Sequence, residues 1–112
     1  MQYALMVYTE PGYAEALPEA EREAVRAEFS ALADDARCAG AVQLQPAETA
    51  TCVRVANGRT LMTDGPFADT KEVLGGVYLL EAANLDEAIE LAARIPAARL
   101  GGVVEVRPVV SR

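Results

Sequence analysis

The hydrophobic pattern begins with a short apolar strand followed by a long amphipathic helix. Residues 2–8 (QYALMVY) are apolar at almost every position, which is typical of a strand buried on both faces. Pro18 is placed to open a helix, because proline is tolerated in the first helical turn, and Gly40 is placed to cap its carboxyl end. The apolar stripe expected on this helix consists of Val25, Phe29, Leu32 and Ala36.

The middle of the chain predicts a β-hairpin. After a short strand at 41–44, Asn57-Gly58 separates residues 51–56 (TCVRVA) from residues 59–64 (RTLMTD), and Asn-Gly is the strongest short hairpin signal. Directly opposed residues share a face, so a two-residue turn places Asp64 on the more apolar face of the hairpin. Its companions on that face are Val53, Val55 and Met62.

The last third of the chain predicts a strand, a helix and a final strand. Residues 73–81 (VLGGVYLLE) are again apolar on both faces. Asn84 and Glu87 have the spacing of a capping box, and the helix that they begin ends at Ile95-Pro96. The residues expected to face inward are Leu85, Ala88, Ile89 and Ala92. Residues 103–109 (VVEVRPV) alternate as a strand.

This order of elements predicts one domain over residues 1–112 with an α+β, ferredoxin-like sandwich fold. Two helices would cover one face of an antiparallel sheet, and the hairpin would be an addition. Yet the strands at 2–8 and 73–81 are apolar on both faces, so the second face needs a cover as well. We therefore expect a symmetric homodimer packed sheet to sheet.

Composition and charge limit the kinds of molecule that this protein is expected to bind. The chain has 17 acidic and 10 basic residues, a formal charge of −7, which disfavours direct binding to nucleic acid or to anionic lipid. Cys38 and Cys52 form no CxxC motif and the chain has no histidine, so it cannot supply a zinc site alone. No apolar run is long enough to span a bilayer, and residues 2–8 run straight into polar turn residues, so we expect no signal peptide there and a cytoplasmic protein.

Three segments together resemble a known family. The run TDGPFADTKEVLGGVYLL, the acidic segment NLDEAIELAARIP and the closing GGVVEVRPV are similar to the YCII-related domain family, in the branch named for its Asp-Gly-Pro-Phe motif. The resemblance covers essentially the whole chain. It implies a dimeric α/β barrel of ferredoxin-like type and a polar cleft that carries a His–Asp pair in one branch. It also implies a link of some members to sigma-factor-type regulators of transcription. Because this chain has no histidine, Asp64 is its matching acidic position.

Asp64 is the candidate catalytic residue. A carboxylate that loses solvation on an apolar face suits general acid or base chemistry near neutrality. The alternative is structural, since Asp before Gly-Pro often caps a turn by accepting backbone N–H bonds. Phe67, after the Gly65-Pro66 corner, is expected to fill the core or the dimer interface, with a ligand wall as its other use.

Each of the other candidate ligand-binding residues also has a structural interpretation. Lys71 could contact an anion or could be a solvated residue at a strand edge. Gly75 and Gly76 weaken a strand, which indicates a bulge or the close approach of a ligand or of another backbone, here across the dimer interface. Tyr8 and Tyr78 could each offer a hydroxyl to a ligand, although a core tyrosine with a bonded hydroxyl is more common.

Two functions remain in competition. The first is a cofactor-independent enzyme that transfers protons with Asp64 in a cleft beside Tyr78 and Lys71, since no metal, flavin or nucleotide motif is present. The second is a non-catalytic module that binds a small ligand or a protein partner in transcription control, as the family resemblance implies. A third, purely structural dimerisation, leaves the TDGPFADTKE segment unexplained.

Overall fold

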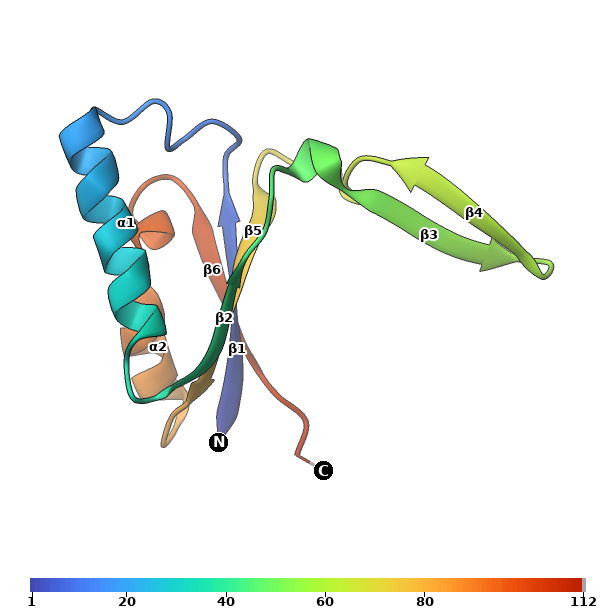
Figure 1. Ribbon diagram of the computed structural model, residues 1–112. Coiled ribbons are helices and arrows are strands. Elements are labelled where there is room, and N and C mark those ends of the chain that lie inside the picture. Colours follow the sequence, from blue (N-terminus) through green and yellow to red (C-terminus); the bar gives the residue numbers. More distant parts are fainter. Residues whose placement is uncertain (112) are drawn as a thin grey trace.

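The computed structural model describes residues 1–111 and has the expected α+β architecture (Figure 1). Arg112, the last residue of the expected domain, lies outside the described residues. Four strands form an antiparallel sheet in the order β2 (Cys38–Gln43), β5 (Val73–Glu81), β1 (Gln2–Thr9) and β6 (Val103–Pro108). Strands β3 (Thr51–Ala56) and β4 (Arg59–Asp64) form a separate two-stranded sheet. The remaining elements are α1 (Glu19–Ala33), α2 (Leu85–Ala93) and the short 3-10 helices η1 (Ala47–Thr49) and η2 (Pro96–Ala98).

The core lies between the four-stranded sheet and the two helices, which cover the same face (Figure 1). Alternate residues of a strand point to opposite faces, and Leu5 of β1 and Leu80 of β5 point to the helices. They pack with Leu91 of α2 and with Ile95, which follows that helix, and each such burial contributes roughly 1.5–3 kcal/mol. Only one face of the sheet is therefore covered within the chain.

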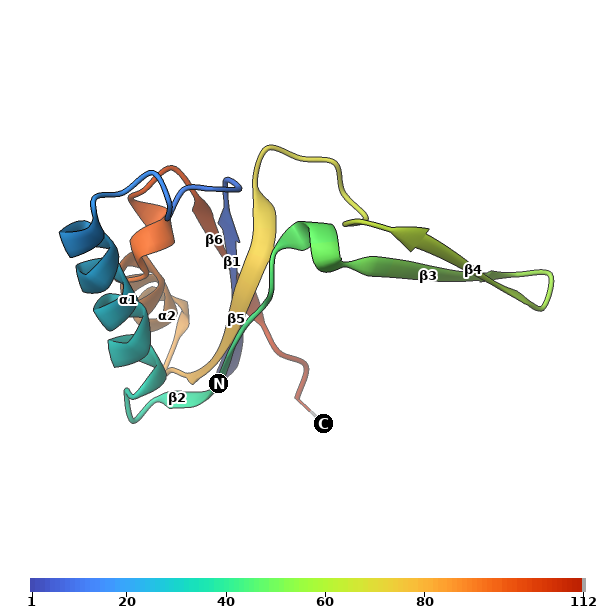
Figure 2. The ribbon, with the colours of Figure 1, turned by 45° about the horizontal axis from the view of Figure 1, so that its top comes forward.

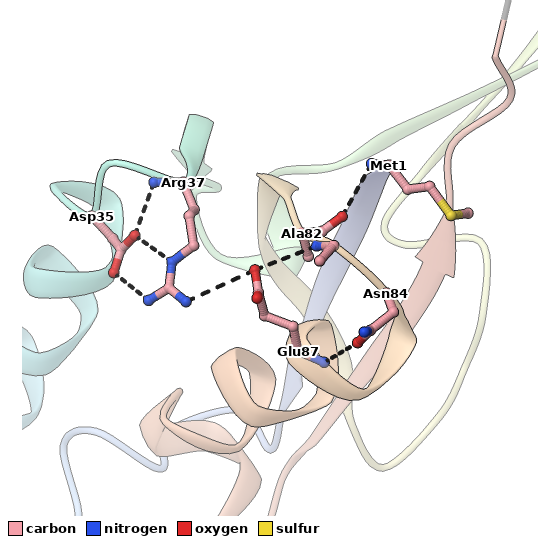
Figure 3. Close-up of polar contacts among 7 residues, drawn as sticks. Met1, Asp35, Arg37, Ala82, Asn84 and Glu87 are labelled. Carbon is pink, nitrogen blue, oxygen red and sulfur yellow. Dashed lines mark hydrogen bonds and ion pairs between the residues drawn. The ribbon is translucent and has the colours of Figure 1, made fainter.

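Helix α1 starts after Pro18 as expected but ends earlier than the sequence predicts. Its last residue is Ala33, so Ala36 is outside the helix and Gly40 lies in β2 instead of capping the helix. The cause is Asp35, whose carboxylate accepts hydrogen bonds from the backbone N–H and the guanidinium of Arg37 at 2.9 and 3.0 Å. Such a local bond competes with helical bonding and turns the chain into β2 (Figure 3).

The capping box of α2 is confirmed, whereas its inward face is partly corrected. The side chain of Asn84 accepts a hydrogen bond from the backbone N–H of Glu87 at 2.9 Å. Ala88 and Ala92 are buried as expected, but Leu85 and Ile89 are about half exposed. The third buried residue of the helix is Leu91, so its buried face consists of Ala88, Leu91 and Ala92.

The hairpin has the predicted register and turn. Thr51 opposes Asp64 and Val53 opposes Met62. Asn57 and Gly58 have φ values of 52° and 73°, the positive values that a type I′ turn requires. The hairpin projects away from the sheet on the side opposite the helices (Figures 1 and 2). The radius of gyration is accordingly 15.8 Å, against about 13 Å for a compact domain near this length.

Candidate functional site

The uncovered face of the sheet, which we call the open face, is largely apolar. Strand register places eight side chains of this kind on it: Ala4, Met6, Tyr8, Val42, Leu74, Val77, Leu79 and Val103. Val42 and Val103 are more than half exposed. Glu105 and Arg107 share the face on β6 and contact each other, as their spacing predicts. This face and the projecting hairpin enclose an angle, which we call the corner (Figure 2).

Asp64 lies at the base of the hairpin, where β4 ends. The chain turns there through Gly65, whose φ is 93° and whose backbone N–H donates to the carbonyl of Ala50 at 2.7 Å. The thiol of Cys52 donates to the carbonyl of Gly65 at 3.2 Å. The Asp64 side chain is exposed, and within residues 1–111 its carboxylate accepts no hydrogen bond. The turn is therefore held by backbone groups and the thiol, with no contribution from the Asp64 carboxylate.

Lys71 follows Asp64 in the loop that leads to β5. Its ammonium group lies 3.0 Å from the carboxylate of Glu10, which follows β1. This hydrogen-bonded pair raises the pKa of Lys71, and the charges of Glu10 and Glu72 add to the effect. Lys71 thus ties the loop to the end of β1 and keeps its positive charge.

Gly75 and Gly76 both have a structural explanation within the chain. The register between β1 and β5 shifts after Val7, so that Gly75 has no partner on β1 and lies in a β-bulge. A bulge is one of the explanations that the sequence predicts for this glycine pair. A Cβ atom on Gly76 would lie 3.0 Å from the carbonyl oxygen of Val42. The close backbone at Gly76 therefore belongs to β2 of the same chain.

The two candidate tyrosines lie on opposite faces of the sheet. Tyr8 is half-buried on the open face, at the same end of the sheet as the hairpin base. Tyr78 is buried against the helices, where its hydroxyl donates to the carbonyl of Phe29 at 2.9 Å. Burial raises the pKa of Tyr78 to about 12. Tyr78 and Gly76 thus belong to the covered face and do not share a cleft with Asp64.

Phe67 does not fill the core of its own chain. Its side chain is 77% exposed, and the guanidinium of Arg54 lies 5.2 Å from the centroid of its ring. A cation over an aromatic face at this distance is a favourable cation–π contact. Of the two predicted positions, core or interface, the core is excluded.

Comparison with known families shows to which family the chain belongs. The model of the YCII-related domain matches residues 1–111, essentially the whole chain. The chain belongs to the YCII-related family. It is also 35% identical to an uncharacterized protein of Rhizobium meliloti (strain 1021), over 96% of this chain and 91% of the relative. In this YCII-related chain the candidate acid is Asp64, with no histidine beside it.

Two grooves that the sequence does not predict lie on the helix side of the YCII-related domain. One, of about 370 Å³, runs between α1 and the end of α2 and is lined by Glu28, Ala31, Leu32, Asp35, Arg94 and Arg99. Arg99 and Glu28 form an ion pair across it at 2.7 Å. The other, of about 250 Å³, is apolar and lies between α2 and β6. Both combine residues from distant elements, so no local sequence signal marks them.

Residues 1–111 hold neither a cluster of metal-ligating side chains nor a membrane-spanning helix. Within that range no three His, Cys, Asp or Glu side chains are grouped to hold a metal ion. None of the helices in the described part of the chain has the length and apolar composition to cross a bilayer.

Proposed function

We propose that this YCII-related protein binds a small organic molecule in a cleft of a homodimer, where Asp64 acts as general acid or base. The observation that carries the proposal is the position of Asp64 at the end of the apolar face of the hairpin, where the hairpin joins the rest of the chain. A second copy in the corner would exclude water from both surfaces. Loss of water favours the neutral form of a carboxyl group and suits it for proton transfer.

The rest of the proposed site follows from the groups around the corner. Tyr8 offers a hydroxyl on the open face, and the bulge at Gly75 adjoins the pair that Tyr8 forms with Leu74. Lys71 supplies positive charge at the same end of the sheet, although Glu10 partly neutralises it. The cysteine and serine side chains have no histidine partner in this chain, so proton transfer by Asp64 is the chemistry that its residues supply best.

A non-catalytic module that binds a ligand or a protein partner, for example in sigma-factor-linked regulation, is the second candidate. Two observations favour it. Lys71 is already paired with Glu10, which weakens its attraction for a substrate anion, and the two grooves described above lie away from Asp64. The strong negative charge of the chain also suits a basic protein surface better than DNA.

The test is a fragment screen by amide chemical-shift mapping on the wild type and on Asp64→Asn. We expect small enols or amides to shift the amides around Tyr8, Gly75 and Asp64, and this binding to weaken by about tenfold in Asp64→Asn because the hydrogen bond to the carboxyl group is lost. The matched control is Asp69→Asn, in the same loop. Shifts confined to the helix side, or equal binding by Asp64→Asn, would contradict the proposed role of Asp64.

A further inference from the structure

The hairpin is a projecting arm that packs against little of its own chain. Every residue of β3 and β4 except Cys52 is exposed. Its apolar face carries three large uncovered side chains: Val53 at 61%, Val55 at 70% and Met62 at 73% exposure. An isolated two-stranded hairpin is at best marginally stable in water. The arm therefore lacks the cover that its sequence and its stability require.

The position of the arm limits what can cover it. It projects on the side of the open face, which is the other uncovered apolar surface of the chain (Figures 1 and 2). Asp64 ends β4 at the base of the arm, and a molecule that fills the corner can contact the arm and the open face at once. A second copy brings a matching pair of surfaces, and a twofold axis lets each copy fill the corner of the other.

Charge also favours a second copy. The hairpin, residues 51–64, contains Arg54, Arg59 and Asp64, a formal charge of +1. Since the whole chain carries −7, the rest of it carries −8. The arm of one copy is therefore complementary to the body of another, whereas two bodies alone repel each other.

We propose that the hairpin Thr51–Asp64 is an exchange arm that lies across the open face of a second copy, so that each site joins Asp64 of one chain to open-face side chains of the other. This inference rests on the proposed function and names the partner of the same site. In this arrangement neither chain has a complete site alone, and the arm both holds the dimer and covers the carboxylate.

The experiment compares Val55→Glu with Leu61→Glu by sedimentation equilibrium. Both positions are exposed hairpin residues and both changes add one negative charge, but Val55 lies on the apolar face and Leu61 opposes Arg54 on the other. We expect Val55→Glu to raise the dimer dissociation constant at least about tenfold, and Leu61→Glu to change it by less than about threefold. Amide spectra of each variant check that the fold is kept.

A second measurement identifies the contact itself. In a dimer mixed from ¹³C-labelled and unlabelled chains, filtered nuclear Overhauser effects should join the Val53, Val55 and Met62 methyl groups of one chain to Met6 or Leu79 of the other. A monomeric wild type, equal effects of the two variants, or a dimer without these contacts would overturn the inference. If the contacts are present and Asp64→Asn still binds fragments normally, the proposed function fails while the exchange arm stands.

Discussion

At the scale of single residues, the position of a side chain on the sheet decides its role. Tyr8 and Tyr78 have the same chemistry, but one lies on the open face and the other is buried beneath α1 with its hydroxyl bonded to Phe29. Tyr78 is therefore a structural residue. A substitution of Tyr78 should therefore change the stability of the fold and leave ligand binding unchanged.

We expect Tyr78→Phe to lower the free energy of unfolding by about 1 kcal/mol at pH 7, because it removes one buried hydrogen bond. The pKa of Tyr78 is about 12 in the fold, above its ordinary value of 10.0. The stabilising effect is thus fully present below pH 10 and is lost as the pH rises toward 12. Urea unfolding across this range should show a shallower alkaline loss for Tyr78→Phe than for the wild type. Tyr8→Phe is the control, and an equal loss in both variants would contradict this role.

Asp64 is expected to be dispensable for the folding of each chain. Its carboxylate makes no hydrogen bond within residues 1–111, so Asp64→Asn should change the free energy of unfolding by less than about 0.5 kcal/mol. Asp35→Asn is the informative comparison, because that carboxylate accepts hydrogen bonds from Arg37 and its pKa is lowered by them. Thermal and urea unfolding should show Asp35→Asn as the clearly weaker protein. A large loss in Asp64→Asn would restore the turn-cap interpretation.

At the scale of elements, helix α2 is connected to the end of α1 by polar groups. Figure 3 shows Arg37 between the carboxylates of Asp35 and Glu87, the second pair at 3.9 Å. The same Glu87 carboxylate accepts a weak bond from the backbone N–H of Ala83, while Asn84 caps the helix. The start of α2 is thus held from both sides, which fixes the helix over the core.

The cap of α2 gives a test at this scale. Asn84→Ala should lower the free energy of unfolding by about 1 kcal/mol, since the backbone N–H of Glu87 loses its acceptor. Asn84→Asp keeps an acceptor and places a negative charge at the positive end of the helix, so it should be close to neutral. Urea denaturation of the three proteins measures both effects. An equal loss of stability in the two variants would contradict the role given to the side-chain acceptor at residue 84.

At the scale of the whole molecule, much of the architecture is predictable because local signals agree with it. Asn57-Gly58 determines the hairpin register, and the capping box at Asn84 places the second helix. The end of α1 was missed because the Asp35–Arg37 turn depends on side-chain geometry that periodicity does not show. For β5, the residues of each face can be grouped, but both groups are apolar, so the sequence could not indicate which face the helices cover.

In solution, we expect a second copy to bury the open face of the sheet. The most direct measurement is the relaxation of methyl protons by a soluble paramagnetic probe. We predict that Met6, Val77 and Leu79 are shielded almost as well as Leu5 in the core, while Leu85 and Ile89 on α2 relax fast. If the open-face methyl groups relax as fast as those of Leu85 and Ile89, no second copy covers the sheet and the account is contradicted.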